Sequence, residues 1–209
     1  MKYLLSYDFV KRFLDIVFAT LILIFLSPLL IFVYVLILIL DKTPVFFSQT
    51  RVGKKGRYFR IYKFRTMIYI KNSVFEGLVN ENIKETKENA RKRFKTTEVN
   101  DNRISKIGRL LRPIHLDELP QLVNVIKGDM SFVGPRPDVP VQEIDYRKKD
   151  WEMRISVKPG ITGLAQLYNC KKLSERNNLD SIYVKRSCFF LDLYILIRTI
   201  FKLFYLKSN

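Results

Sequence analysis

Several residue types on which common catalytic sites depend are scarce in this 209-residue sequence. It contains two cysteines, Cys170 and Cys188, and one histidine, His115. The cysteines have neither redox nor metal-ligand spacing, which argues against a zinc site and favours a reducing compartment. Walker A, GxGxxG, HExxH and GxSxG segments are absent. Nothing in the sequence therefore supports P-loop, nicotinamide, zinc-protease or serine-hydrolase chemistry.

Acidic residues are also few, because 20 Asp and Glu stand against 37 Lys and Arg, a formal net charge of +17. This excess excludes an acidic disordered protein. It suits a phosphate-rich partner, which could be nucleic acid, anionic lipid head groups or a phosphorylated substrate. Composition does not choose among the three, but helix-turn-helix and RNA-binding aromatic motifs are absent, so we expect no nucleic-acid partner.

Charge is missing altogether from residues 16–40, a stretch of 25 residues. At about 1.5 Å per residue, a helix of this length is roughly 37 Å long, against about 30 Å for the hydrocarbon core of a bilayer. Ser27 and Pro28 lie at its midpoint. The ring of Pro28 clashes with the carbonyl of Ile24, so we expect a kink in which Ser27 satisfies a freed carbonyl.

Basic residues flank this apolar stretch on both sides, with Lys11 and Arg12 before it and five more between 42 and 57. Positive charge favours the cytoplasmic side of a membrane. A helix bent at Pro28 that enters and leaves by the cytoplasmic leaflet keeps both clusters on that side. An ordinary kinked transmembrane helix would carry one cluster across. The residues alone leave these two alternatives open.

The rest of the sequence predicts a mixed α/β fold that is mainly helical. Apolar-aromatic runs at 45–47 and 58–62 flank a basic turn containing Gly53 and Gly56, as is typical of a β-hairpin. Apolar spacing predicts two helices, over 103–112 and 117–127, the second ending at Gly128. The expected apolar faces are Ile104, Ile107, Leu110 and Leu111 in the first helix, and Leu122, Val125 and Ile126 in the second.

Two segments of opposite character complete the chain. Residues 70–100 are polar and dense in charge, and we expect a surface insertion or a lid with helix around 80–95. The C-terminal segment from Phe189 is mostly apolar, and its polar residues fall roughly on one side of a helix: Asp192, Arg198, Thr199 and Lys202. This pattern indicates an amphipathic helix in the membrane interface, with a core helix as the alternative.

Three segments combine turn residues with cations that could bind phosphate: 63–67, 128–137 and 158–163. Glycine and proline fix turns whose backbone amides can point at an anion, and neighbouring Arg and Lys supply charge. Arg136 lies between Pro135 and Pro137, which hold its backbone rigid and suit it to present a guanidinium to phosphate. Each segment alone is weak evidence for phosphate binding, because most basic turns are simply exposed to solvent.

Asp117 and Glu118 stand as adjacent carboxylates in a basic and apolar neighbourhood. At a helix N-terminus, the dipole would keep a carboxylate ionised. An ionised Asp117 could attack phosphorus, and Glu118 could hold Mg²⁺, which prefers oxygen ligands. The alternative is that Asp117 only caps the helix, with Glu118 in its first turn. Spacing alone favours the cap.

Several motifs together resemble one known family, the bacterial sugar transferases, which are small monotopic phosphoglycosyl transferases. The motifs are KRxLD before an apolar segment with a central Ser-Pro, FSQTRVGKKGRYFRIYKFRTM, LDELPQLVNVIKGDMSFVGPRP, KPGITGLAQ and a closing LD..YV….LDL. The match runs over about residues 10–205 and thins out only in 70–100. His115, where Ser or Thr is expected, and Lys185-Arg186 depart from the family pattern.

This resemblance implies a re-entrant membrane helix broken at Ser27-Pro28 as an anchor over residues 1–42, and a catalytic domain over residues 43–209. It also implies a transferase in which Asp117 is the nucleophile and Glu118 its acidic partner, both at Mg²⁺. Asp117 would attack the sugar-bearing phosphorus of a UDP-sugar and release UMP. Undecaprenyl phosphate would then take the phosphosugar, as the first membrane step of polysaccharide biosynthesis. The residues implied to contact substrate are Lys63, Arg65, Arg112, Gly134, Pro135, Arg136 and Pro137.

The expected partners are a UDP-sugar, the polyprenyl phosphate and membrane lipid, and the apolar helices permit a homodimer without requiring one. The implied location is the bacterial inner membrane, with the catalytic domain on its cytoplasmic face. A membrane-tethered basic adaptor that binds anionic lipid or nucleic acid is the alternative function. The dyad of Asp117 and Glu118 discriminates between the two, because an adaptor has no use for carboxylates amid a basic face.

Overall fold

The computed structural model describes residues 2–41, 44–68, 87–93, 101–170 and 172–205. Helices dominate these residues, and the strands form two small two-stranded sheets. The α-helices are α1 (Lys2–Leu40), α3 (Lys87–Arg93), α4 (Lys106–Leu111), α5 (Leu122–Lys127), α6 (Lys148–Arg154), α7 (Leu164–Leu167), α8 (Leu173–Arg186) and α9 (Phe189–Tyr205). The strands are β1 (Phe46–Val52), β2 (Tyr58–Phe64), β3 (Ser131–Val133) and β4 (Gly160–Thr162), and the 3₁₀ helices are η1 (Lys54–Gly56), η2 (Arg112–Ile114), η3 (Leu116–Gln121) and η4 (Pro140–Asp145).

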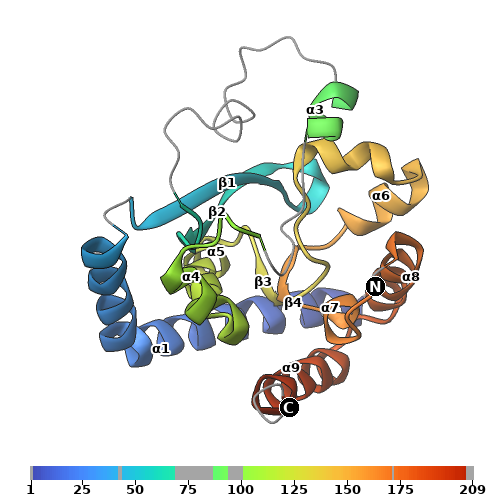
Figure 1. Cartoon of the computed structure of the whole chain (residues 1–209). Coiled ribbons are helices and arrows are strands. Elements are labelled where there is room, and N and C mark those ends of the chain that lie inside the picture. The colour runs from blue at the N-terminus through green and yellow to red at the C-terminus, as the bar shows by residue number, and fades with distance from the viewer. Residues whose placement is uncertain (1, 42–43, 69–86, 94–100, 171, 206–209) are drawn as a thin grey trace.

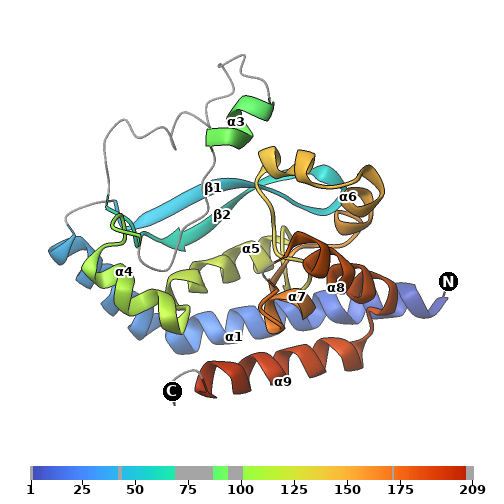
Figure 2. The same ribbon diagram turned by 45° about the vertical axis from the view of Figure 1, so that its right-hand side comes forward.

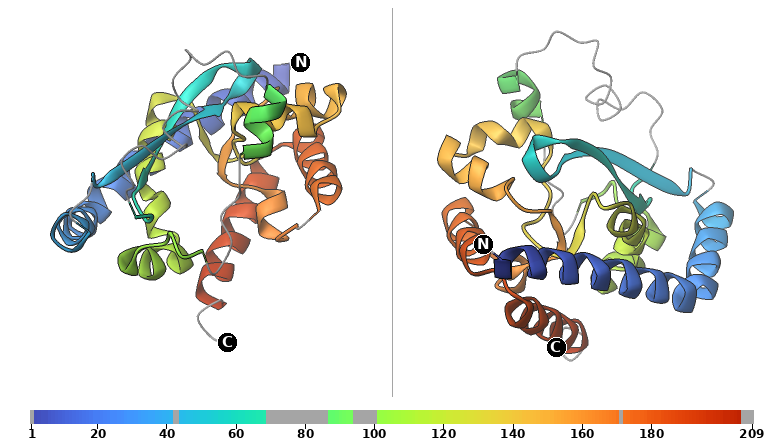
Figure 3. Two further views of the ribbon diagram at one scale, coloured as in Figure 1. Left: turned by 45° about the horizontal axis from the view of Figure 1, so that its top comes forward. Right: turned by 180° about the vertical axis from the view of Figure 1, so that it is seen from behind.

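Helix α1 has an interior proline and is bent. Figures 1 and 3 show a long arm that turns sharply into a shorter one. Pro28 lies inside the helix, and the Ser27 hydroxyl donates a hydrogen bond of 2.8 Å to the carbonyl of Ile24. This is the carbonyl with which the proline ring clashes, so the predicted compensation is confirmed. Of the described helices, α1 alone has the length and composition to cross a membrane.

The predicted hairpin is confirmed and covers one side of a small layered core. Strands β1 and β2 pair in antiparallel register from Phe46 opposite Phe64 to Val52 opposite Tyr58. Figure 2 shows α5 between this ribbon and the long arm of α1. One apolar cluster joins the three layers through Ala19 of α1, Ile61 of β2, and Leu122 and Val125 of α5 with Met130 beyond it. A second cluster packs the short arm of α1 against β2 and α4.

The C-terminal helix α9 is amphipathic, and its apolar face points outward. Asp192 is buried and accepts hydrogen bonds from Tyr7 and Lys11 of α1 and from Tyr183 of α8. The exposed apolar side chains are Phe189, Phe190, Leu193, Tyr194, Ile197, Ile200, Phe201 and Leu203. The opposite face packs against β3 and α8 through the buried Ile195, so α9 is not buried on all sides, and its position in the membrane interface stays a prediction.

The described residues correct two further expectations about the helices. The segment 117–127 is not one α-helix, because η3 precedes α5 and contains Pro120. In the segment 103–112, Ile104, Ile107 and Leu111 are buried as expected, but Leu110 is exposed. The predicted face of α5 and its end at Gly128 (φ 92°) are confirmed. Of the charge-dense segment only α3 is described, so most of the expected helix around 80–95, and the role of 70–100, lie outside the described residues.

Candidate functional site

The carboxylates of Asp117 and Glu118 lie in η3, which begins after a sharp reversal of the chain at His115. That residue adopts φ 53°, a left-handed conformation that is uncommon outside glycine. The amide of Glu118 donates to the His115 carbonyl at 3.1 Å, which closes the turn. The expected N-terminal cap is therefore wrong. His115, not Asp117, occupies the capping position, and η3 has no side-chain cap hydrogen bond.

Glu118 is held by two cations that come from different parts of the chain. Lys63 of β2 donates from Nζ to Glu118 Oε1 at 2.5 Å, and Arg136 donates from Nη2 to the same oxygen at 3.1 Å. Burial alone would raise the pKa of Glu118, but the charges of Arg136 and Lys63 outweigh it and hold the pKa far below its usual range. Glu118 is therefore an ionised carboxylate at neutral pH.

Asp117 has the opposite electrostatic environment. Its residue is 8% exposed, and among the described residues no donor forms a hydrogen bond or ion pair with its carboxylate. Burial raises its pKa, the charge of Glu118 raises it further, and the cations Lys63 and Arg112 offset part of this effect. The expectation that a helix dipole keeps Asp117 readily ionised is thus wrong in direction. A poorly solvated carboxylate of this kind is a stronger nucleophile than one stabilised by donors.

The loop that carries Arg136 is fixed by close packing of its glycines. Strand β3 pairs in parallel with β4, and the amide of Gly134 donates to the Thr162 carbonyl at 2.9 Å. A Cβ on Gly160 would lie 2.1 Å from the Gly134 nitrogen, so only glycine permits this crossing. The segments 128–137 and 158–163, which the sequence marked as phosphate-binding turns, are therefore one structural unit.

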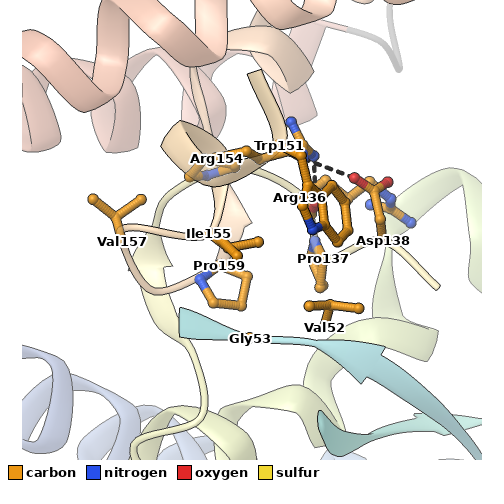
Figure 4. Close-up of a pocket in the computed structure, with 11 residues that line it drawn as sticks. Val52, Gly53, Arg136, Pro137, Asp138, Trp151, Arg154, Ile155, Val157 and Pro159 are labelled. Carbon is orange, nitrogen blue, oxygen red and sulfur yellow. Dashed lines mark hydrogen bonds and ion pairs between the residues drawn. The ribbon is translucent and has the colours of Figure 1, made fainter. Parts of the chain in front are cut away.

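A buried network of charges holds the same loop from behind. Arg154 of α6 donates from Nη2 to the backbone carbonyl of Arg136 at 2.5 Å and from Nε to Asp138 at 2.7 Å (Figure 4). Asp138 also accepts from the Tyr146 hydroxyl at 2.7 Å and from Arg176 of α8. Arg154 further pairs with Asp180. These contacts fix the backbone of the loop, and Pro135 and Pro137 restrict it further. The position of Arg136 Cα is therefore fixed, and its side chain extends from there to Glu118.

A cavity of about 550 Å³ opens beside the dyad. Its polar lining includes His115, Glu118, Arg136 and Arg176, together with Thr199 and Lys202 of α9. Its apolar lining includes Ile22 of α1, Leu119, Leu122, Phe132 and Ile161. Of the dyad, Glu118 lines this cavity, and Asp117 is not among the described lining residues. The two helices with exposed apolar faces thus form walls of the same cavity that carries the charged groups.

The structure brings some of the predicted substrate-binding residues to the dyad and places others elsewhere. Lys63 and Arg136 contact Glu118, and Arg112 donates to the Thr66 hydroxyl at 2.8 Å while its charge acts on Asp117. Arg65 instead donates to the backbone carbonyls of Pro44 and Phe46 at the start of the hairpin. Gly134, Pro135 and Pro137 are buried, and they shape the loop more than they present groups to a ligand.

Sequence reasoning missed the lining residues that come from α8 and α9. Arg176 adds a second arginine to the cavity, and Lys202 donates to the carbonyls of Gln166 and Leu167 at the end of α7. Neither lies in a recognisable motif. The helical spacing of Arg176 and Asp180, which form an i, i+4 pair, was the available signal for the first.

Asp117 and Glu118 could hold a metal ion only if the substrate supplied further ligands. The described residues contain no group of three or more His, Cys, Asp and Glu side chains that could hold a metal. Glu118 uses Oε1 for both of its ion pairs, which leaves its second carboxylate oxygen for another ligand. Mg²⁺ is often held by one or two carboxylates together with substrate phosphates. The pair therefore suits a Mg²⁺ ion that arrives with a diphosphate.

Comparisons with known proteins give matches over almost the whole chain. A family model described as bacterial sugar transferase matches residues 6–205. The UDP-glucose:undecaprenyl-phosphate glucose-1-phosphate transferase of Klebsiella pneumoniae is 37% identical over 207 residues, which cover 95% of this chain and 41% of that protein. The undecaprenyl-phosphate galactose phosphotransferase of Salmonella typhimurium is 41% identical over 197 residues, covering 93% of this chain and 40% of that protein.

A shorter relative matches over most of its own length. The uncharacterized sugar transferase EpsL of Bacillus subtilis is 38% identical over 194 residues, which cover 92% of this chain and 86% of that protein. By contrast, the chain spans about two fifths of the length of the Klebsiella and Salmonella proteins. The part matched by the family model includes the dyad, the loop that carries Arg136, most of α1 and all of α9.

Proposed function

Because the chain belongs to the bacterial sugar transferase family, we propose that it transfers a sugar 1-phosphate from a UDP-sugar to undecaprenyl phosphate. One observation carries this proposal above the others. A buried Asp117 without hydrogen-bond donors among the described residues lies next to an ionised Glu118 that is held by Lys63 and Arg136. This pair adjoins a cavity whose walls come partly from α1 and α9. A phosphate-bearing lipid and a nucleotide diphosphate would meet at such a boundary.

In the first proposed step, a carboxylate oxygen of Asp117 attacks the sugar-bearing phosphorus of the UDP-sugar. A bond forms between Asp117 and phosphorus, and the bond from phosphorus to the bridging oxygen breaks. UMP leaves with that electron pair. Arg136 contacts the phosphates through the guanidinium surface that Glu118 does not cover, since its side chain is 47% exposed. Arg176, which lines the same cavity, supplies a second positive charge.

In the second proposed step, a phosphate oxygen of undecaprenyl phosphate attacks the same phosphorus and displaces the Asp117 carboxylate. The product is a polyprenyl diphosphate sugar. Because the two anionic substrates occupy the site in turn, they avoid a mutual repulsion of about 4 kcal/mol per charge pair at 4 Å and an effective dielectric of 20. The apolar lining from Ile22, Leu119 and Phe132 suits the first part of a prenyl chain.

Asp117 and Glu118 would hold Mg²⁺ together with the diphosphate, and the ion would neutralise charge on the leaving phosphate. For the membrane, we propose that α1 is re-entrant at Ser27-Pro28, forms an anchor over residues 1–42 and leaves residues 43–209 on the cytoplasmic face. The bend of α1 and the basic residues on both of its flanks support this topology (Figure 1). The outward apolar face of α9 supports a position of that helix in the interface.

The test uses the full chain in nanodiscs with Mg²⁺, a panel of UDP-sugars and undecaprenyl phosphate, and it measures UMP. We expect UMP release with at least one sugar. Without undecaprenyl phosphate, we expect a single burst of UMP no larger than the amount of enzyme, because each Asp117 can hold one phosphosugar. UMP that appears only when both substrates are present would contradict the covalent step. No UMP with any sugar, in a preparation where an active relative works, would contradict the proposed activity.

The adaptor alternative is tested on the same preparation. If the basic surface served only to bind nucleic acid, the protein would bind it in a salt-dependent manner that Asp117→Asn does not alter, and no UMP would form. We expect UMP formation to depend on Asp117. Asp150→Asn is the matched control, because Asp150 is a carboxylate paired with the exposed Arg147 and lies outside the cavity lining.

A further inference from the structure

Lys158, in one of the three segments that the sequence marked as phosphate-binding, does not reach the dyad. It is absent from the described lining of the 550 Å³ cavity. Its ammonium group lies instead next to the end of α5, beside Arg12 of α1. A Cβ placed on Gly128 would be 3.2 Å from Arg12 Nη2 and 3.6 Å from Lys158 Nζ. Two cationic groups from distant parts of the chain therefore face one small space.

The positive charge in this space has little compensation. Arg12 donates to the backbone carbonyls of Val125 and Ile126 at 2.5 and 2.7 Å, which uses two of its five N–H donors and leaves its charge without a described ion-pair partner. Lys158 forms no hydrogen bond or ion pair with a described side chain. Burial lowers the pKa of Lys158, and the charges of Arg12 and then Lys54 lower it further. An anion that entered this space would relieve that repulsion.

Two carboxylates lie in the neighbourhood, Asp15 and Asp129, and their charges act on Lys158 in the opposite direction. Asp15 is already used, because it accepts from the Phe132 amide at 3.1 Å. Neither carboxylate is within 4 Å of a described lysine or arginine nitrogen, so neither forms an ion pair here. Both carboxylates thus have other partners, Asp15 the Phe132 amide and Asp129 the side-chain amide of Asn124 at 3.5 Å.

Exposed apolar side chains flank these cations on α1. Phe9 is 76% exposed one turn before Arg12, and Ile16 is 38% exposed one turn after it. Residues three and four apart share one face of a helix. Arg12 therefore lies between two apolar side chains on the helix that is apolar and long enough to cross a membrane. A ligand that carries both phosphate and hydrocarbon fits this arrangement better than free phosphate does.

We propose that Arg12 and Lys158 bind the phosphate of an anionic phospholipid, whose acyl chains lie along the exposed apolar face of α1. The bound phosphate neutralises the repulsion around Lys158. It also holds the first arm of α1 against the end of α5, the helix that follows the dyad. This site is separate from the cavity beside Glu118, and it does not depend on the proposed transfer of a sugar phosphate.

The test compares lipid retained by the full chain after extraction in mild detergent, measured by native mass spectrometry, with phosphatidylglycerol and phosphatidylcholine supplied in equal amounts. We expect wild-type protein to retain phosphatidylglycerol preferentially. Lys158→Gln should reduce that retention about fivefold, since one lysine near a membrane surface contributes on the order of a fivefold change in anionic-lipid binding. Lys54→Gln should reduce it less, because the charge of Lys54 affects Lys158 less than that of Arg12 does.

Lys55→Gln is the control, because Lys55 is the exposed neighbour of Lys54 on the same turn. Equal losses in Lys55→Gln and Lys158→Gln would overturn the proposal in favour of diffuse attraction. Unchanged retention of phosphatidylglycerol in Lys158→Gln would also overturn the proposal. Arg12 is left intact because it supports the end of α5. A separate experiment adds millimolar inorganic phosphate. If phosphate displaces the lipid, and raises the melting temperature of wild type but not of Lys158→Gln, the proposal of a lipid ligand is overturned and the site binds free phosphate.

Discussion

Asp117 and Asp138 are both buried carboxylates next to the loop of Arg136, and their surroundings differ in one respect. Asp138 accepts hydrogen bonds from Arg154, Arg176 and Tyr146. Burial would raise its pKa, but the two arginines outweigh that effect and lower it. Asp117 is close to the cations Lys63 and Arg112 without a hydrogen bond to a described donor, and its pKa is raised, first by burial and then by Glu118.

The difference separates a carboxylate that organises the fold from one that is available for reaction. The three donors on Asp138 fix α6 and α8 to the loop, and they lower the reactivity of its carboxylate because they stabilise its charge. Leaving Asp117 without donors is unfavourable for folding, since a buried charge without hydrogen bonds is costly. Functional sites commonly retain such unfavourable groups. The two carboxylates should therefore respond in opposite ways to substitution, and the predictions below test that contrast.

The largest expected effect is on turnover in Asp117→Asn. The amide has nearly the same shape as the carboxylate but cannot form the bond to phosphorus, so UMP release should fall by at least about 10³-fold. The measurement is the rate of UMP formation in nanodiscs, with circular dichroism to show that the fold is kept. Asp138→Asn provides the comparison, because it should lose activity only in proportion to lost folded protein. Full turnover in Asp117→Asn would remove the distinction between the two carboxylates.

The largest expected effect on stability is in Arg154→Met. Arg154 is 6% exposed and pairs with both Asp138 and Asp180, so its loss leaves Arg176 as the remaining ion-pair partner of two buried carboxylates. Breaking a buried pair in this way typically costs about 3–5 kcal/mol. The fluorescence of Trp151, the single tryptophan, can report unfolding in detergent, because its ring lies 5.3 Å from that of Tyr146, which donates to Asp138. A loss below about 1 kcal/mol would mean that the network is not structural.

The sequence allowed prediction of features that depend on neighbouring residues. The kink at Pro28, the hairpin and the end of α5 at Gly128 follow from local chemistry, and the structure has all three. The amphipathic character of α9 could also be predicted. The dyad could be marked as unusual, because two adjacent carboxylates in a basic segment are visible without a structure.

Features that depend on distant contacts could not be predicted. Arg154 and Arg176 lie 16 and 38 residues from Asp138, and no spacing rule connects them. The capping interpretation of Asp117 failed for a local reason that the pattern concealed. His115 adopts a left-handed conformation and Pro120 lies inside η3, so the chain forms a 3₁₀ helix where apolar spacing predicted an α-helix. The position of Lys158 likewise depends on the path of α1.

A smaller effect of opposite sign is expected for the stability of Asp117→Asn. Because the pKa of Asp117 is raised in the folded state, its ionised form destabilises the fold at neutral pH. The substitution should therefore raise the free energy of unfolding by on the order of 1 kcal/mol. The gain should be present at neutral pH and vanish as the pH falls below the ordinary pKa of an aspartate, where the carboxyl is protonated in both states. A gain that is independent of pH would contradict this origin.

The smallest effect is expected for an ion pair that is exposed. Arg147 donates to Asp150 at 2.8 Å, a geometry as good as that of Arg154 with Asp138, but its side chain is 87% exposed. Exposed pairs contribute about 0–1 kcal/mol because water solvates both charges after the pair is broken. Arg147→Ala should leave turnover unchanged and should not shift the unfolding transition measurably in the same Trp151 assay. A loss comparable to that of Arg154→Met would show that pairing itself, and not burial, separates the structural carboxylate from the reactive one.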